Sequence, residues 1–172
     1  MFHICKSKDD KFYVVLVAGN HEALSVNETF EQKESAWRNM VAQLNCFNDA
    51  AIWVGDRTVE DCAFYRFEPS GRKETVLQPS IKNTLVNIWL AENQQFYVTV
   101  RSHNNQTLSS TETFNHKQSA WVNIQAQMIA LGGFMVRVQD NTTENQQQYW
   151  LHDNGNKVLH TAHPSKQPNL DK

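Results

Sequence analysis

The hydrophobic positions of this chain change from a strand period to a helix period and back. Val and aromatic residues fill residues 12–18, which predicts a β-strand, and Gly19-Asn20 then favours a hairpin turn. Apolar residues recur once per turn over residues 32–45, which predicts an amphipathic helix with one buried face. Further short strands are expected near residues 2–5, 22–27, 51–54, 64–67 and 73–77.

The same pattern returns 84 positions later. Phe12-Tyr13-Val14 matches Phe96-Tyr97-Val98, and Ser35-Ala36-Trp37 matches Ser119-Ala120-Trp121. A constant offset over many positions predicts an internal duplication, with a second helix over residues 116–130. The predicted organisation is a first repeat over residues 1–81, a second repeat over residues 85–163 and a flexible tail over residues 164–172.

Short connections between the strands of each repeat favour antiparallel neighbours. The predicted fold class is therefore α+β, with two pseudo-symmetric repeats that are each an antiparallel sheet with one helix packed on one face. The helical spacing of Trp37 and Trp121 from their apolar neighbours makes them core residues rather than ligand-stacking rings. Because each repeat is small, a core shared between the two is expected.

Composition makes some classes of function less favoured. The net charge is −2 with no long basic run, which disfavours a nucleic-acid partner. No apolar run is long enough for a membrane helix, and the start lacks the layout of a secretory signal, so no membrane partner is expected. Cys5, Cys46 and Cys62 form no CxxC pair, which predicts reduced thiols in a cytoplasmic protein.

Two polar segments are the sharpest candidates for chemistry. Each carries two carboxylates and a hydroxyl on alternate positions, which could bind a divalent cation or activate a water molecule. The simpler interpretation, which we favour, is that Asp and Thr bond to nearby backbone N–H groups in turns. The candidate residues are Asp56, Thr58 and Glu60 in the first repeat and Asp140, Thr142 and Glu144 in the second.

Other patterns for catalysis or cofactor binding are weak. His160 and His163 are three residues apart, but they lie in a predicted strand that runs into Pro164, so no metal site is expected. The chain has no phosphate-binding loop, dinucleotide fingerprint or nucleophile elbow, so no cofactor and no catalytic residue is assigned.

The strand faces differ between the repeats. Phe12, Val14 and Leu16 are expected to meet the helix, as are their counterparts in the second repeat. The opposite face is apolar in the first repeat, with Val15 and Val17, and we expect it to be covered. In the second repeat that face carries Tyr97, Thr99 and Arg101, which we expect to be exposed and which are candidate ligand-binding residues.

The order of these motifs resembles the YegP-like family of uncharacterised, mostly bacterial proteins. The resemblance is carried by an aromatic strand, a turn, a polar strand that ends in Glu and an aromatic residue, and a helix start. Those segments are Phe12-Tyr13-Val14, Gly19-Asn20, residues 25–30 and residues 33–44, with counterparts in the second repeat. The chain departs from the family pattern at Asn39 and Asn123, where a helix glycine is usual. The resemblance implies a tandem helix-on-sheet fold and no catalytic residues.

The leading prediction for function is a non-enzymatic interaction or ligand-binding module whose partner is a second copy of itself, as a homodimer, or another protein. One alternative is a carboxylate- or metal-dependent enzyme at the two Asp-x-Thr-x-Glu segments. A second alternative is a single-stranded nucleic-acid binder that uses the face of Tyr97 and Arg101. Carboxylates that converge with a histidine would favour the enzyme.

Overall fold

The computed structural model describes residues 1–47, 49–77, 85–102 and 104–160 of the 172-residue chain. The fold is α+β, as predicted, and these residues form two helices and one sheet of twelve strands. The first repeat forms β1 (Phe2–Lys6), β2 (Phe12–Val17), β3 (Ala23–Val26), α1 (Lys33–Cys46), β4 (Ile52–Asp56), β5 (Ala63–Phe67) and β6 (Lys73–Val76). The second forms β7 (Leu85–Leu90), β8 (Phe96–Arg101), β9 (Thr107–Ser110), α2 (Lys117–Leu131), β10 (Met135–Asp140), β11 (Gln148–His152) and β12 (Lys157–Leu159).

Element types and positions agree with the sequence. Both helices lie within one or two residues of their predicted bounds, and each is followed by three short strands. The predicted tail over residues 164–172 and His163 lie outside the described residues.

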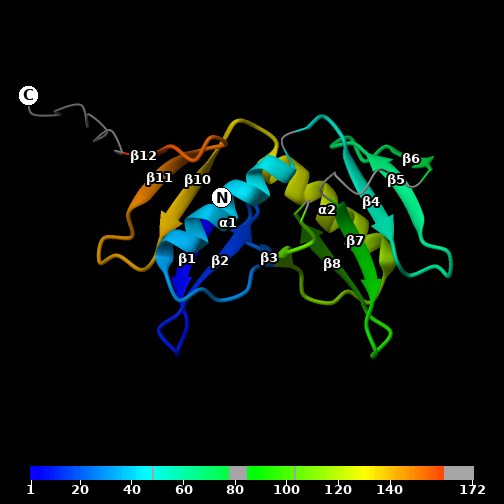
Figure 1. The fold of residues 1–172 in the computed structure, drawn as a ribbon, viewed down its shortest axis with the longest axis horizontal. Coiled ribbons are helices and arrows are strands. Elements are labelled where there is room, and N and C mark those ends of the chain that lie inside the picture. Colours follow the sequence, from blue (N-terminus) through cyan, green and yellow to red (C-terminus); the bar gives the residue numbers. More distant parts are fainter. Residues whose placement is uncertain (48, 78–84, 103, 161–172) are drawn as a thin grey trace, which may run out of the picture.

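The strand pairing corrects the expectation of one antiparallel sheet per repeat. The strands run in the order β12-β11-β10-β1-β2-β3-β9-β8-β7-β4-β5-β6, so every repeat contributes to both sides of the sheet (Figure 1). Parallel pairs β1–β10 and β4–β7 join the repeats, which makes the sheet mixed. Strand periodicity identifies β-strands but does not identify their partners. In each repeat, the three strands that precede the helix and the three that follow it lie in different parts of the sheet.

Two halves are therefore defined by space rather than by sequence. Half A contains β12, β11, β10, β1, β2 and β3 with α1, and half B contains β9, β8, β7, β4, β5 and β6 with α2. The halves meet where β3 and β9 pair at one position, Val26 with Ser110. Pairing at a single position contributes little to stability. Contacts of the helices and of the hydrophobic core must therefore hold the two halves together.

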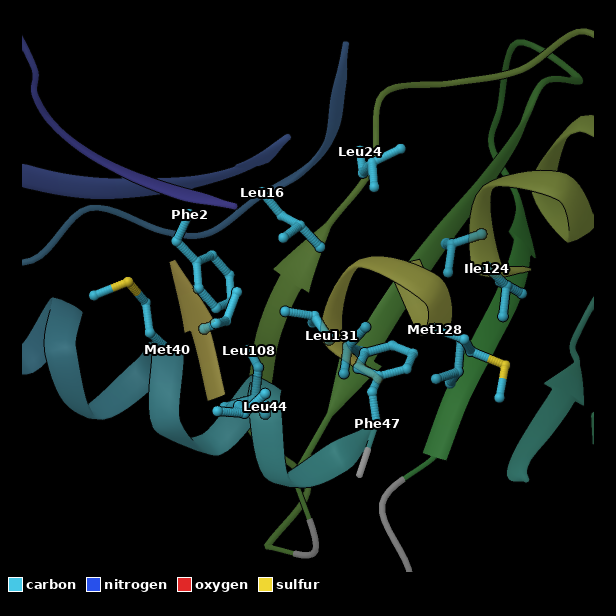
Figure 2. Packing of buried hydrophobic residues seen from close by; sticks show 14 of the residues in the cluster. Phe2, Leu16, Leu24, Met40, Leu44, Phe47, Leu108, Ile124, Met128 and Leu131 are labelled. Atoms are coloured by element: carbon cyan, nitrogen blue, oxygen red, sulfur yellow. The ribbon is translucent and has the colours of Figure 1, made fainter. Parts of the chain in front are cut away.

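One hydrophobic cluster spans both halves. Met40 and Leu44 of α1 and Ile124 and Met128 of α2 turn into the same interior region (Figure 2). Trp37 and Trp121 are each 5% exposed, which confirms that they are core residues. A shared core suits the size of the repeats, because a larger folded unit buries a larger fraction of its surface than a unit of half the length. Within the described residues, neither helix has the length and apolar content needed to cross a membrane.

Candidate functional site

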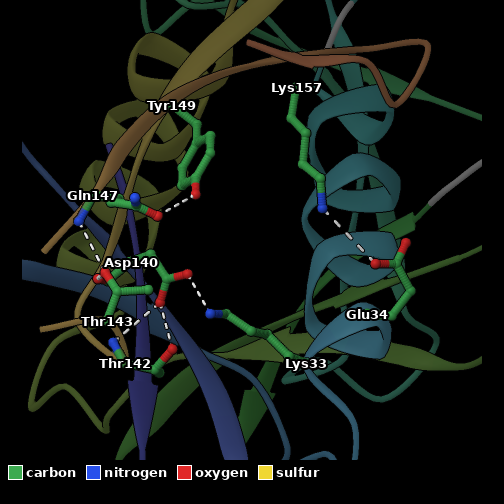
Figure 3. A network of polar contacts seen from close by, with 8 residues as sticks. All are labelled: Lys33, Glu34, Asp140, Thr142, Thr143, Gln147, Tyr149 and Lys157. Carbon is green, nitrogen blue, oxygen red and sulfur yellow. Dashed lines mark hydrogen bonds and ion pairs between the residues drawn. The ribbon is translucent and has the colours of Figure 1, made fainter. Parts of the chain in front are cut away.

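The two Asp-x-Thr segments hold each helix to strands of the other repeat. Lys33 at the start of α1 lies 2.5 Å from the carboxylate of Asp140 on β10 (Figure 3). Lys117 at the start of α2 donates to Asp56 on β4 at 2.9 Å. The lysines are 84 positions apart, as are the aspartates. Both ion pairs therefore join different repeats.

Each aspartate also organises its own turn. The Thr58 backbone N–H donates to Asp56 Oδ1 at 3.0 Å, and the Thr58 hydroxyl donates to the same atom at 2.5 Å. Thr142 makes the same two bonds to Asp140. The interpretation of these segments as turns is confirmed. The sequence did not reveal the role of the lysines, because Lys117 is 61 residues from Asp56 and Lys33 is in the other repeat from Asp140.

The carboxylates do not converge on a histidine. Glu60 and Glu144 are exposed, while Asp56 and Asp140 are 4% and 1% exposed and are bound by Lys and Thr. Burial raises the pKa of the Asp56 carboxyl, but hydrogen bonds from Lys117 and Thr58 outweigh burial and leave that pKa below its ordinary value. In the described part of the chain, no group of three His, Cys, Asp or Glu residues could hold a metal ion. These segments therefore act as structural ties.

A second set of cross-repeat contacts lies where each helix crosses a hairpin. Asn39 of α1 donates from Nδ2 to the carbonyl of Leu108 at 3.0 Å, and Asn123 of α2 donates to the carbonyl of Leu24 at 2.9 Å. Gln127 Nε2 in turn donates to Asn123 Oδ1 at 2.7 Å. The positions that depart from the YegP-like pattern thus bind the backbone of the other repeat.

Beside each of these asparagines lies a groove between a helix and the opposite hairpin. The first, the Arg38 groove, has a volume of about 490 Å³ and is lined by Glu28, Arg38, Asn39, Gln106 and Leu108 among others. The second, the Val122 groove, has a volume of about 710 Å³ and is lined by Glu22, Leu24, Glu112, Val122, Asn123 and Ala126 among others. Both volumes are in the range of ligand pockets.

The two grooves differ in charge although they occupy corresponding places. Glu28 of the first corresponds to Glu112 of the second, but Arg38 corresponds to Val122 and Gln106 corresponds to Glu22. The Arg38 groove thus pairs one carboxylate with one guanidinium. The Val122 groove has two carboxylates, and among its lining residues there is no Lys or Arg. The sequence pattern had pointed to neither groove, because each needs residues from both repeats.

The predicted ligand-binding residues on β8, which are Tyr97, Thr99 and Arg101, are only partly exposed to solvent. Thr99 is 7% exposed because Trp89 of β7 lies over it, with Trp89 Nε1 donating to Thr99 Oγ1 at 2.9 Å. Tyr97 and Arg101 are half-buried. The expectation of an exposed face is wrong at Thr99, because the neighbouring strand supplies a large ring. On the first repeat Val17 is 7% exposed and Val15 is half-buried, so the chain itself covers Val17.

Two solution structures share this architecture. YegP from E. coli, described as a protein of unknown function, aligns with a TM-score of 0.52 and 20% identity over 81% of this chain and 90% of its own. The chain has the fold of YegP. A UPF0339 protein from Shewanella oneidensis aligns with a TM-score of 0.55 and 16% identity over 81% of this chain and 88% of its own.

The resemblance predicted from the sequence is confirmed at the level of the YegP fold. No family model and no curated protein matches the chain. At these identities the likeness concerns the fold alone, and YegP brings no described activity to it.

Proposed function

We propose that this chain is a non-enzymatic binding protein whose Val122 groove takes a basic side chain, flanked by apolar groups, from a segment of another protein. One observation supports this proposal above the others: Glu22 and Glu112 line a groove whose other lining residues are uncharged, and within the described residues neither forms an ion pair. A cation that enters the groove would supply the missing charge partner.

The walls fit the stem of such a side chain. Lys and Arg bury an aliphatic stem along apolar surface and keep the charged end near water. Leu24, Val122 and Ala126 offer that surface, and the carboxylates lie in the same groove. The Arg38 groove carries its own guanidinium, which would repel the same ligand.

The ligand can be sought by selecting peptides from a displayed random library on the wild-type protein. Selected sequences should be enriched in Lys or Arg next to Leu, Ile or Val. The affinity of one selected peptide would then be measured by isothermal titration calorimetry. The double variant Glu22→Gln/Val122→Arg, which copies the Arg38 groove, should bind at least about tenfold more weakly, because it removes one attractive charge and adds a repulsive one.

Glu28→Gln is the matched control, because it removes the corresponding carboxylate from the Arg38 groove. It should leave the affinity for the peptide unchanged. Selected peptides without basic residues, or equal binding by the wild type and the double variant, would overturn the proposal.

We also infer that the two repeats arose by duplication and are related by a pseudo-twofold axis near the β3–β9 junction. Support comes from contacts that recur 84 positions apart. Lys33–Asp140 corresponds to Lys117–Asp56, and the edge-to-face pair Trp37–Tyr149 corresponds to Trp121–Tyr65. The Cys5 and Cys62 thiols, which form no disulfide, support a reducing, cytoplasmic location.

A further inference from the structure

A cluster of rings and guanidinium groups lies on the face of half B that points away from the helices. The guanidinium carbon of Arg101 is 5.3 Å from the centre of the Trp89 ring, and that of Arg57 is 5.9 Å from it. Arg57 is also 5.4 Å from the Phe64 ring. Three strands and the end of a fourth thus bring two cations and two rings together, although they are far apart in the sequence.

Hydrogen bonds to neighbouring side chains hold the members of the cluster in place. Arg57 Nε donates to Asn87 Oδ1 at 2.9 Å, and Trp89 is bonded to Thr99. Gly55 leaves the necessary room, because a Cβ there would lie 2.8 Å from Asn87 Oδ1 and 3.4 Å from Arg57 Nε. Any side chain at this position would therefore displace the Arg57–Asn87 bond.

Neither arginine forms an ion pair within the described ranges of the chain. Arg57 is exposed, and Arg101 is half-buried with its NH1 nitrogen bonded to the neutral Asn105 side chain at 3.1 Å. Two positive charges on one aromatic surface are thus left without a carboxylate.

The corresponding positions of half A lack these groups, although its face carries Arg137 at 6.0 Å from the Trp150 ring. Asn141 stands in place of Arg57, Val17 in place of Arg101, and Cys5 in place of Trp89. Gly55 corresponds to Gln139. Because half A has the same strands with other residues at these positions, the fold does not require this particular set of residues.

We propose that this face of β4, β5, β7 and β8 binds single-stranded nucleic acid, with Arg57 and Arg101 on phosphates and the neighbouring rings against bases. Open sheet faces with aromatic residues bind unpaired bases by stacking, and arginine fits phosphate through parallel N–H donors. The sequence alone disfavoured this partner because the net charge is −2 and only Tyr97 and Arg101 on one strand supported it. The structure adds Arg57, Phe64 and Trp89.

Fluorescence anisotropy of a labelled, short oligouridylate tests the proposal. With two phosphate contacts, log K should fall with log salt concentration with a slope of about −1.4, which is about −0.7 per contact for a single strand. Arg57→Asn, which copies half A, should weaken binding about tenfold at low salt and reduce the slope to about −0.7. Arg101→Val, which also copies half A, should act in the same way.

Arg38→Val is the charge-matched control, because it removes one arginine from the helix side of the sheet and copies Val122. It should leave both affinity and slope unchanged. The proposal is overturned if the oligouridylate does not bind at low salt, if Arg38→Val weakens binding as much as Arg57→Asn, or if a duplex of the same length binds equally well. The groove lies on the other side of the sheet, so these results leave the peptide proposal untouched.

Discussion

Among single residues, the buried aspartates Asp56 and Asp140 are expected to contribute most to stability. Asp56 is 4% exposed and accepts from Lys117 and from two groups of Thr58. A buried carboxylate with such partners stabilises the fold only while it is ionised, since protonation removes the charge that the lysine needs.

We expect Asp56→Asn to lower the free energy of unfolding by about 1.5–3 kcal/mol at pH 7, the usual range for hydrogen bonds to charged groups. The folded pKa of Asp56 lies below its ordinary value of 3.8. The stabilisation is therefore complete above that value and is lost as the pH falls through the lower, folded pKa. Urea unfolding at several pH values should show the wild type and the variant converging below about pH 4.

Glu60→Gln is the control, because Glu60 is an exposed carboxylate four residues away. Its effect should stay within about 0.5 kcal/mol at every pH. A difference between wild type and Asp56→Asn that stays constant into acid would show that the Asp56 charge does not matter.

At the scale of elements, each helix is anchored to a hairpin of the other repeat. Asn123 of α2 is 8% exposed and bonds to the Leu24 carbonyl, and Gln127 supports it from the next turn. Polar contacts of this kind fix the position of a helix on the sheet, because an apolar surface would allow it to slide.

Asn123→Ala should lower the free energy of unfolding by about 1–3 kcal/mol, because the Leu24 carbonyl and the Gln127 amide would lose a buried partner. Alanine favours the helix, so the loss must come from the contact with the hairpin. Thermal or urea unfolding measures the effect. Ile129→Ala on the same helix, where the side chain is 67% exposed, should change stability by no more than about 0.5 kcal/mol. Equal effects of both substitutions would contradict the anchoring role.

At the scale of the whole molecule, β4–β6 extend the sheet from β7, and β10–β12 extend it from β1. β4 pairs with β7 of the other repeat rather than with β1 of its own, and β1 pairs with β10. A single repeat therefore has two strand edges that lack their parallel neighbours.

Residues 1–81 expressed alone should form a homodimer, because a second copy can supply the strands that the second repeat supplies in the full chain. Light scattering coupled to size-exclusion chromatography should give twice the mass of the fragment, and circular dichroism should show helix and strand. A folded monomer with the helix content expected for α1 would contradict this prediction.

The sequence by itself determined the elements of this protein. The strand and helix periods and the recurrence of Phe12-Tyr13-Val14 and Ser35-Ala36-Trp37 fixed the α+β class, the helix positions and the buried tryptophans, since local periodicity reports which face of an element is buried. It also identified the Asp-x-Thr turns, because an Asp side chain reaches a backbone N–H two residues away.

Only the tertiary structure decided which elements meet. The pairing of β1 with β10, the bond from Lys117 to Asp56 and the gathering of Arg57, Trp89 and Arg101 join residues far apart in the sequence. Similar strand periods in both repeats made pairing within a repeat and pairing between repeats indistinguishable from the sequence. The helices favour pairing between repeats. Each helix packs on strands of both repeats, and the strands that follow it lie in the other half of the sheet.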